Sequence, residues 1–463
     1  MRNRFNICSG TDSYKLCHHS QYLNGTERVY AYFESREGAK YPETVFFGLQ
    51  YILMEYLAGY VVTQEKIDRA AALCSAHMGD DTIFNRAMWE HILVNHNGKL
   101  PIRIKAVPEG TPVNVGNVLM TVENLDHKCW ALTNHLETIL SHVWYASNVA
   151  TISRAVKKDL KKWIELSVDE NGYGALDFML HDFGFRGASC IEAAGIGGAG
   201  HLVNFKGTDT IRAIEVLQDY YCAEEMPGFS VPATEHSVMT AGGPEGERAV
   251  VSQLLKNHPN GILSIVIDSY NAFEFITEIL GRDFKDQILR RDGVVVARPD
   301  SGDPVPTMLE CLERLLDAFG GTKNDKGYMV INPSVKVLWG DGLTHETINE
   351  ICEAITGDGW SMANIATFGM GGGLLQRHDR DTQRSAFKCS AQMRNGQWRD
   401  IYKDPIDSSK ASKRGKLKLV KNDWGYSTSN CHPYRDEMNV VFEMGEITYM
   451  NALADIRKRA AIG

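Results

Sequence analysis

The sequence has no closely spaced cysteine pair, no long uninterrupted apolar run and no excess of positive charge. Its ten cysteines are scattered without a C-x-x-C spacing, which is typical of reduced thiols in a cytosolic protein. The most apolar long stretch, residues 45–62, contains Gln50, Glu55 and two glycines, so we expect a buried helix there. The first residues, MRNRFNICSGTDSYK, lack the apolar core of a secretory signal. We therefore expect a cytoplasmic protein without a membrane span.

The charge composition argues against nucleic acid and membrane surfaces as partners. There are 49 basic and 58 acidic residues, a formal net charge of -9, which repels polyanions unless a basic patch is local. Such a patch occurs at Lys403–Lys421, with seven basic residues and no aromatic residue among them. We interpret this patch as a loop that is either simply solvated or closes over phosphates during turnover. The 43% apolar share is that of an ordinary globular protein.

From about residue 180, a short apolar run followed by a polar or glycine-rich turn recurs, with amphipathic helical stretches such as 307–318 and 344–355 between the runs. Continuously apolar runs are typical of parallel strands buried on both faces. The runs are Phe178–Leu180, Ser264–Ile267, Val294–Ala297, Val335–Leu338 and Ile365–Phe368. The pattern predicts an irregular α/β barrel over residues 151–389, with its chemistry at the carboxyl ends of the strands.

The rest of the chain does not show this pattern of apolar runs and polar turns. Segments 102–107 and 113–122 resemble strands of a separate sheet, and the tail contains alternating stretches at 397–402 and 439–442 that could return to it. We expect residues 1–150 and 390–463 to form a second, smaller α+β domain that is discontinuous in sequence.

Two familiar motifs are discounted. Gly195-x-Gly197-x-x-Gly200 matches a dinucleotide fingerprint but follows no apolar strand, so close helix packing is the better explanation. Asp182-Phe183-Gly184 matches a kinase magnesium motif, but the sequence lacks the accompanying H-R-D loop and V-A-I-K strand.

The polar residues after the later apolar runs suit a sugar phosphate. Arg298 can form a fork onto a pyrophosphate while Asp300 accepts two ribose hydroxyls, although a salt-bridged turn would look the same. Glycines at 340–342 and 371–373 would let backbone N–H groups approach phosphate oxygens.

A histidine and an aspartate complete the set of candidates. His236 follows a proline turn in a polar setting, where an imidazole could act as a nucleophile, although an ordinary surface or core histidine is the usual alternative. Asp268 closes an apolar run and could orient an imidazole or hold Mg²⁺, whereas a helix N-cap is the structural alternative.

Along nearly the whole length, the sequence resembles the nicotinamide phosphoribosyltransferases. The resemblance rests on ordered motifs that include TDSYK (11–15), YFESRE (32–37), ETVFFGLQYIL (43–53), HDFGFRG (181–187), HLVNFKGTDT (201–210), SVPATEH (230–236), RPDSG (298–302), GDG (340–342), GGGLLQ (371–376) and FKCS (387–390). It implies a type II phosphoribosyltransferase fold and a homodimer with two active sites at the subunit interface. The substrates would be nicotinamide, phosphoribosyl pyrophosphate and ATP, with Mg²⁺ as cofactor.

The resemblance also implies roles for individual residues. His236 would be phosphorylated by ATP, supported by Glu235 and by Asp268, which could also contact Mg²⁺. Phe183 and Tyr14 of the partner subunit would sandwich the pyridine ring. The other residues expected to bind substrate are Asp12, Arg36, Arg186, Asp209, Ser230, Ser264, Arg298, Asp300, Gly340, Asp341, Gly371, Gly372, Arg380, Lys388 and Lys403.

Asp209 would set the choice of pyridine. A carboxylate accepts a hydrogen bond from the amide NH2 of nicotinamide but repels the carboxylate of nicotinate. Two like charges about 4 Å apart cost about 4 kcal/mol at an effective dielectric constant near 20, roughly a thousandfold in binding. The alternatives are a nicotinate phosphoribosyltransferase and a non-catalytic signalling protein on the same fold.

Three positions depart from the family pattern. Ala386 replaces a serine that contacts phosphate, Phe185 a tyrosine and Met370 a serine. Only Ala386 bears on the expected chemistry, where a lost hydroxyl contact would be worth roughly 0.5–1.5 kcal/mol.

Overall fold

The computed structural model describes residues 5–404, 412–431, 433 and 435–462. The chain divides into two compact units. Unit 1 comprises residues 1–151, 216–224 and 379–461, and unit 2 comprises residues 152–215, 225–378 and 462–463. The final segment of unit 1 starts at Asp379, ahead of the expected position near 390, because the strand that begins at Ser385 pairs within the sheet of unit 1. The two units are of similar length.

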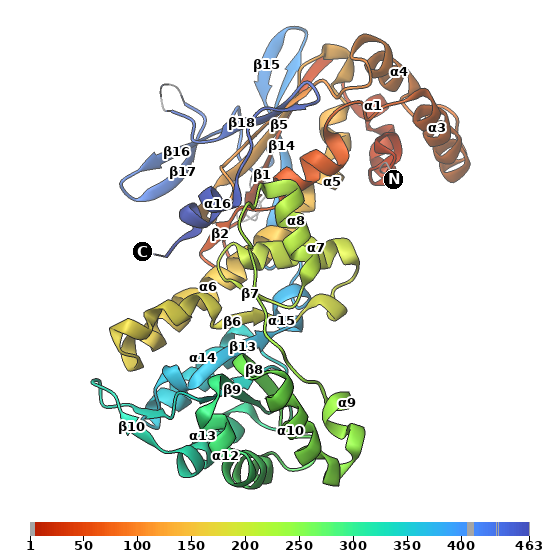
Figure 1. Cartoon of the computed structure of the whole chain (residues 1–463). Coiled ribbons are helices and arrows are strands. Elements are labelled where there is room, and N and C mark those ends of the chain that lie inside the picture. Colours follow the sequence, from red (N-terminus) through yellow and green to blue (C-terminus); the bar gives the residue numbers. More distant parts are fainter. Residues whose placement is uncertain (1–4, 405–411, 432, 434, 463) are drawn as a thin grey trace. The chain divides into compact units, whose positions relative to one another are not determined.

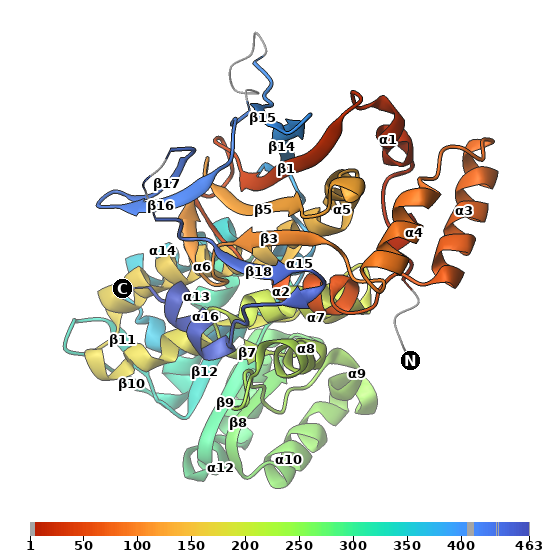
Figure 2. The same cartoon turned by 90° about the horizontal axis from the view of Figure 1, so that it is seen from above.

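The described part of unit 1 is built on a seven-stranded sheet in the order β15-β14-β1-β5-β3-β18-β19, whose central strands lie in succession in Figure 2. Its strands are β1 (Thr26–Ser35), β3 (Ile102–Ala106), β5 (Val118–Asn124), β14 (Ser385–Arg394), β15 (Gln397–Asp400), β18 (Asn439–Glu443) and β19 (Glu446–Ile447). β5 is buried along its whole length, and β3 alternates between buried and half-buried residues. The tail segments thus return to the sheet, because β18 pairs with β3, and β15 pairs with β14 beside β1.

Shorter elements complete unit 1. They are β2 (Glu43–Val45), β4 (Pro112–Asn114), the hairpin of β16 (Lys418–Asn422) and β17 (Gly425–Ser429), α1 (His18–Gln21), α2 (Leu49–Ile52), α3 (Gln64–Met78), α4 (Arg86–Asn95), α5 (Leu132–Ser141), α16 (Leu453–Ala460), the π-helix η3 (Leu53–Leu57), which continues α2, and the 3-10 helices η1 (Ile7–Ser9), η2 (Ser13–Cys17) and η4 (His127–Cys129). Helix α5 contacts β1, β5 and β14. Its buried apolar residues include Leu132, Leu136 and Leu140, four apart as for one face of a helix.

Unit 2 contains a parallel sheet, in its described part six strands in the order β7-β6-β13-β12-β9-β8. These strands are β6 (Leu180–Asp182), β7 (Gly207–Thr208), β8 (Asn260–Val266), β9 (Asp292–Arg298), β12 (Val335–Trp339) and β13 (Ile365–Met370). Residues 263–266, 295–297 and 337–339 are buried, as expected for strands covered on both faces. The amphipathic helices α13 (Pro304–Phe319) and α14 (His345–Gly357), both labelled in Figure 1, pack against each other, and α13 also packs against β12.

An irregular segment joins the two edges of the parallel sheet. Phe229 forms a parallel bridge with Gly207 of β7, and Ala233 forms one with Ser264 of β8. The bridges are reinforced by backbone hydrogen bonds from Thr208 to Phe229 and from Thr234 to Ser264, both of 3.0 Å. The predicted irregular α/β barrel is therefore confirmed. Residues 229–234, which we call the closing segment, lead directly into His236.

The remaining elements of unit 2 are mostly helical. They are α7 (Ile191–Leu202), α9 (His236–Met239), α10 (Glu247–Asn257), α11 (Ala272–Glu274), α12 (Lys285–Arg290), α15 (Gly372–Leu375), the strands β10 (Gly321–Lys323) and β11 (Met329–Ile331), the π-helix η9 (Phe275–Asp283), and the 3-10 helices η5 (Glu170–Phe178), η6 (Phe185–Gly187), η7 (Thr240–Gly242), η8 (Pro244–Gly246) and η10 (Met362–Asn364). Two of the boundaries between the units fall inside the helices α6 (Val143–Ser167) and α8 (Ile211–Tyr221). The glycines 195, 197 and 200 lie inside α7, where a Cβ on the neighbouring Gly198 would come 2.7 Å from the Cβ of Ala213. This supports close packing as the reason for the glycine pattern.

Three expected elements differ from the structure. The strand expected at 178–180 begins only at Leu180, because residues 170–178 form the 3-10 turn η5 and Phe178 is exposed. The stretch 113–122 is two strands, separated by a turn in which Gly116 has a φ of 83°. The helix expected over 45–62 covers only residues 49–57, since Val45 belongs to β2.

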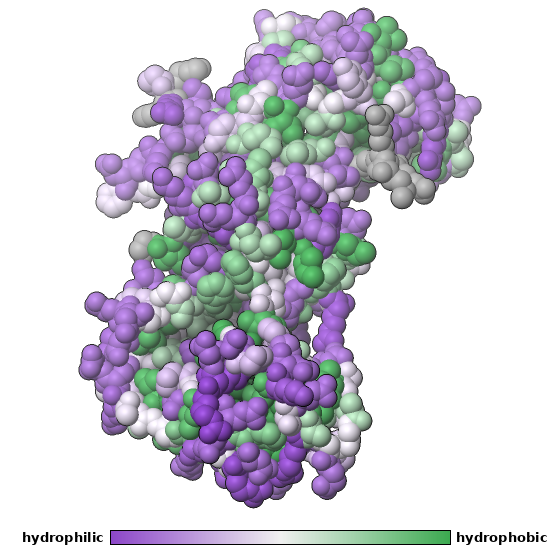
Figure 3. Space-filling view, in the orientation of Figure 1, coloured by the Kyte–Doolittle hydropathy of each residue, from purple (hydrophilic) through white to green (hydrophobic). Residues whose placement is uncertain are grey.

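Among the described residues, no helix combines the length and the apolar character needed to cross a membrane. Figure 3 shows hydrophilic residues over most of the visible surface of the α3 and α4 region.

Candidate functional site

A cavity of about 930 Å³ opens at the carboxyl ends of the parallel strands of unit 2. All of its lining residues belong to unit 2, and they lie at or after the ends of β6, β7, the closing segment, β8, β9, β12 and β13. The lining comprises Phe183, Phe185, Arg186, Gly187, Asp209, Ala233, Thr234, Glu235, His236, Ser237, Val266, Arg298, Asp300, Gly340, Asp341, Gly342, Leu343, Gly371, Gly372, Gly373, Gln376 and Arg377. Residues that are nearly two hundred positions apart in sequence therefore meet in one place.

The aromatic ring of Phe183 lies in a slot that only glycine permits. A Cβ on Gly369 would come 2.0 Å from the ring, and one on Gly340 would come 2.9 Å from it. The guanidinium carbon of Arg298 lies 4.9 Å from the ring centroid, a cation–π geometry. The ring is thus fixed at the cavity wall, where a flat neutral ring could stack upon it.

Asp209 presents a carboxylate to the same cavity. Its Oδ1 accepts hydrogen bonds from Ser230 Oγ at 2.5 Å and pairs with His181 Nε2 at 2.9 Å. Burial alone would raise the pKa of Asp209, but the hydrogen bond and charge of His181, the Ser230 hydroxyl and the Arg298 charge outweigh it and lower this pKa below its ordinary value. The side chain therefore carries a negative charge at neutral pH.

His236 lies beside two carboxylates. Its Nε2 is 3.9 Å from Asp268 Oδ1 and 3.9 Å from Asp300 Oδ2, and the imidazole is 49% exposed. Its Nδ1 lies 3.3 Å from the hydroxyl of Ser269. The ring is half exposed and lines the cavity near two carboxylates, an arrangement that suits a nucleophilic or charge-bearing imidazole.

Residues that follow β9 hold the side chain of Asp268 through hydrogen bonds. Its Oδ2 accepts hydrogen bonds from the Ser301 hydroxyl and, at 2.9 Å, from the Asp300 backbone N–H. Its Oδ1 is buried and has no hydrogen-bond partner among the described residues. This oxygen, on a side chain that is 6% exposed, fits a hydrogen-bond donor or a hard cation as partner.

Arg298 and Asp300 form the expected pair after β9. Arg298 Nη2 donates to Asp300 Oδ1 at 3.2 Å, while the buried Nε has no hydrogen-bond partner in the described part of the chain. The Trp339 indole donates to the Asp341 carbonyl at 2.8 Å and so fixes the turn after β12. Gly371 and Gly372 line the cavity at the end of β13. These groups can bind a ribose and its phosphate together.

Two expected substrate contacts of unit 2, Ser230 and Ser264, do not line this cavity, although the Ser230 hydroxyl donates to Asp209, which does. Ser264 belongs to β8 and is 3% exposed, and its backbone N–H donates to the Pro232 carbonyl at 3.0 Å. Ser264 therefore belongs to the backbone pairing between β8 and the closing segment.

The remaining expected contacts lie in unit 1. They are Asp12, Tyr14, Arg36, Arg380, Lys388 and Lys403. Arg36 and Arg380 line a second cavity, of about 500 Å³, together with Arg384, Ser385 and Ala386. Tyr14 is 58% exposed. Asp12 Oδ2 accepts a hydrogen bond from the Thr138 hydroxyl at 2.6 Å.

Lys388 lies in β14 beside Glu34, at 3.9 Å. Burial, and after it the charges of Arg36, Lys413 and Lys403, outweigh the attraction of Glu34 and lower the pKa of Lys388. Residues 405–411 of the expected basic loop lie outside the described residues. Two of its lysines are paired within unit 1, Lys413 with Glu34 and Lys416 with Glu123.

The sequence reasoning missed several residues of the first cavity. His181, which orients Asp209, and Gly369, which makes room for Phe183, were not singled out. Gln376 and Arg377 also line the cavity. His181 stands inside the HDFGFRG motif and could have been noticed there, whereas Gly369 has no distinguishing sequence signal.

The fold and this site define an enzyme of the phosphoribosyltransferase class. Solved structures with a similar fold are a nicotinate-nucleotide pyrophosphorylase from Pyrococcus furiosus (TM-score 0.62, 16% identity, 99% of this chain and 96% of that one) and human nicotinic acid phosphoribosyltransferase (TM-score 0.60, 15% identity, 97% and 92%). Residues 178–448 match the nicotinate phosphoribosyltransferase (NAPRTase) family, and residues 6–104 match the N-terminal domain of nicotinamide phosphoribosyltransferase.

Proteins with similar sequences identify the family within this class. The chain is 46% identical over 420 residues to a nicotinamide phosphoribosyltransferase of Xanthomonas campestris, covering 90% of this chain and 88% of the relative. It is 33% identical to one of Acinetobacter baylyi, covering 100% of this chain and 98% of that one. The chain belongs to the nicotinamide phosphoribosyltransferase family.

Proposed function

We propose that this enzyme transfers the phosphoribosyl group of phosphoribosyl pyrophosphate to nicotinamide, giving nicotinamide mononucleotide and pyrophosphate in NAD salvage. The relatives named above support the reaction, and one observation favours the amide as substrate: Asp209 places a charged carboxylate in the cavity that contains Phe183. A carboxylate can accept from an amide NH2 but repels the carboxylate of nicotinate.

The first test is product formation by the purified chain. Each pyridine is supplied separately with phosphoribosyl pyrophosphate and Mg²⁺, and nucleotide and pyrophosphate are measured. A higher kcat/KM with nicotinamide is expected. Equal or better use of nicotinate would instead support the alternative that the chain is a nicotinate phosphoribosyltransferase. Absence of product with either pyridine would support the non-catalytic alternative, although His236, Asp268, Arg298 and Asp300 are all assembled here.

In this reaction the pyridine nitrogen attacks C1 of the ribose while pyrophosphate leaves. The nitrogen lone pair forms the new bond, so no general base is needed. Stacking on Phe183 and a hydrogen bond to Asp209 would orient the ring, and Asp300 would hold the ribose hydroxyls. Arg298 would stabilise the charge on the phosphate groups as the C1–oxygen bond breaks.

The donor set also fits the expected Mg²⁺. The unpartnered Oδ1 of Asp268 is a hard oxygen ligand facing His236 near Asp300. Asp268 would hold the ion through this oxygen, and the remaining ligands would come from pyrophosphate. When bound, the ion neutralises charge on the leaving group.

ATP coupling through His236 is the second part of the proposal. An imidazole nitrogen would bond to the γ-phosphorus as the bond to the bridging oxygen breaks and ADP leaves, and water would later release phosphate. The exposed imidazole beside Glu235, Asp268 and Asp300 supports this step. His236→Ala is expected to lose ATP hydrolysis and retain slower basal transfer, whereas His258→Ala, a histidine outside the cavity, retains both. Undiminished ATP hydrolysis in His236→Ala would remove this step from the mechanism.

The third part is a homodimer with shared active sites. The cations expected from the family to bind phosphate are divided between the two units, and those of unit 1 would complete the unit 2 cavity of the partner subunit. Mixing Asp300→Ala with Arg380→Ala chains tests this, because only a mixed dimer then contains one intact shared site. We expect recovery of up to about a quarter of wild-type activity after subunit exchange. No recovery in confirmed mixed dimers would mean that each chain acts alone.

We also place the enzyme in the cytoplasm. All ten cysteines are free, and those at 190, 222 and 431 are exposed, which suits a reducing compartment.

A further inference from the structure

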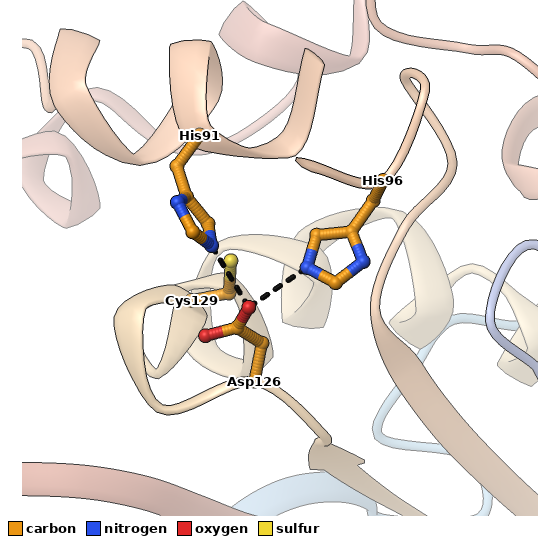
Figure 4. Close-up of side chains that lie close together, drawn as sticks. All are labelled: His91, His96, Asp126 and Cys129. Atoms are coloured by element: carbon orange, nitrogen blue, oxygen red, sulfur yellow. Dashed lines mark hydrogen bonds and ion pairs between the residues drawn. The ribbon is translucent and has the colours of Figure 1, made fainter. Parts of the chain in front are cut away.

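Four potential metal ligands meet in unit 1, and none of them belongs to the two cavities described above. His91, His96, Asp126 and Cys129 each offer one ligand atom, and these atoms all lie within 4.8 Å of one another. Figure 4 shows both imidazoles directed at the Asp126 carboxylate, with the Cys129 sulfur beside them. Both Nε2 atoms lie 2.8 Å from Asp126 Oδ2. We propose that this cluster is a zinc site.

The chemical types of the four ligand atoms favour Zn²⁺ over other ions. Two imidazoles and one thiol favour a borderline-soft transition metal, whereas Mg²⁺ and Ca²⁺ prefer sites made only of oxygen. Zn²⁺ is the common ion that binds nitrogen, sulfur and carboxylate oxygen with tetrahedral geometry. Four protein ligands fill that geometry, so the ion would have a structural role and leave no position for a substrate.

The ligand spacing is that of a structural zinc site. The two histidines are separated by four residues, and Asp126 and Cys129 by two. Structural sites commonly combine a histidine pair separated by three to five residues with a second pair separated by two to four. Here the first pair comes from α4 and the residue that ends it, and the second from η4 and its N-cap.

The scaffold positions the ligands with only small adjustments needed. The Lys128 backbone N–H donates to Asp126 Oδ1 at 2.8 Å and so leaves Oδ2 for the cluster. Ligand atoms of tetrahedral zinc are roughly 3.3–3.7 Å apart, given bonds of about 2.0–2.3 Å. The two 2.8 Å contacts would therefore open by about half an ångström, and the longest separation would shorten by about one.

Proton transfers accompany binding in a balanced way. Each imidazole would bind through Nε2 and carry its proton on Nδ1, and Asp126 would bind as the carboxylate. The Cys129 thiol would lose its proton to solvent as the sulfur–metal bond forms. The oxidation state of zinc does not change. The only bonds that change are the four metal–ligand bonds that form and the S–H bond of Cys129 that breaks.

The site would fasten α4 to the turn that follows β5. Contacts between α4 and η4 already exist, and the side chains of His91, His96 and Asp126 are only 15–18% exposed. Cys129 is fully buried. An ion among these four groups would cross-link two segments thirty residues apart, and would raise the stability of unit 1 against heat.

The direct test uses the full-length, untagged chain. After treatment with a chelator, the protein is dialysed against Zn²⁺ and then against metal-free buffer, and retained metal is measured. We expect one Zn²⁺ per chain and a higher Tm. In place of Zn²⁺, Co²⁺ should give the intense visible bands of tetrahedral coordination and a sulfur-to-cobalt charge-transfer band. No cysteine lines the unit 2 cavity, so that band reports this site and not a metal bound beside His236.

Matched variants complete the test. His96→Gln and Cys129→Ala should lose the retained zinc, and Cys129→Ala should also lose the charge-transfer band. The controls His77→Gln, an exposed histidine of α3, and Cys74→Ala, a buried cysteine of the same helix, should keep both. Wild-type protein that retains only substoichiometric zinc, or cobalt-bound protein without the sulfur band, would overturn the proposal whether or not the variants fold.

Discussion

Replacing Asp209 by Asn tests the origin of substrate preference with little change in shape. The asparagine oxygen can still accept from Ser230 and pair with His181, so the local hydrogen bonds at Oδ1 are preserved. What is removed is one negative charge facing the position of the pyridine substituent. The variant should therefore use nicotinate much better than the wild type does, and nicotinamide about as well or slightly worse.

The size of the effect follows from the exposure of the carboxylate. Two unit charges about 4 Å apart interact by about 4 kcal/mol at an effective dielectric constant near 20 and about 1 kcal/mol in bulk water. The Asp209 side chain is 48% exposed, so an intermediate value applies. We expect about 2 kcal/mol, a change of roughly 30-fold in the ratio of kcat/KM for the two pyridines. This is smaller than the thousandfold expected from sequence, because solvent screens the interaction.

The assay is steady-state kinetics with each pyridine at saturating phosphoribosyl pyrophosphate. Ser230→Ala is the control, since it removes a hydrogen bond to Asp209 without changing charge and should alter the ratio little. The pKa of Asp209 is held below its ordinary value, so the carboxylate stays charged until the pH falls below about 4. The preference should accordingly be constant between about pH 6 and 9. A change below about threefold in Asp209→Asn would refute the electrostatic explanation.

Three further predictions concern sterics, phosphate binding and pH. Gly369→Ala would place a Cβ 2.0 Å from the Phe183 ring and should raise the KM for nicotinamide roughly 5- to 150-fold, or about 1–3 kcal/mol, whereas Gly357→Ala, with open space around it, should not. Ala386→Ser restores a hydroxyl in the basic cavity of unit 1 and should lower the KM for phosphoribosyl pyrophosphate roughly two- to tenfold; an unchanged KM would separate that cavity from the substrate. Burial lowers the pKa of His201 to about 3, so the unfolded chain binds an extra proton below about pH 6.5 and stability falls as the pH falls. From pH 7 to 5 this costs about 2 kcal/mol, measurable by urea unfolding, and His201→Gln should remove that part of the slope.

The barrel could be predicted from sequence because its later strands bury long apolar runs. Residues 294–297, 335–338 and 365–368 all lie in parallel strands, and the two amphipathic stretches are α13 and α14. The closing segment could not be predicted, because it pairs through single bridges and needs no apolar run. The ten-residue strand β1 of unit 1 was also missed as a strand, since its apolar residues are interrupted by Glu27, Arg28 and Glu34.

The polar residues of the unit 2 cavity were predictable because they stand directly after strands, where loops of parallel strands converge. Arg298 and Asp300 were found in this way, His236 through the proline turn before it, and Phe183 and Asp209 through the family resemblance. Ser264 is an expected substrate contact that the structure places outside the lining of this cavity, because sequence alone does not show which way a strand residue points. The histidine pair of the proposed zinc site was overlooked, although its four-residue separation is visible in the sequence.

The strand order of unit 1 has a consequence for how the protein is made. The adjacent strands β1, β5 and β3 leave the ribosome early, but their outer neighbours β14 and β18 are synthesised some 260 residues or more after β5. Until then, both edge strands of the nascent three-stranded sheet expose unpaired backbone N–H and C=O groups that can pair with another polypeptide chain. Translation that stops before Ser385 should therefore yield an aggregating or chaperone-bound fragment, even though nearly all of the barrel sequence has already emerged.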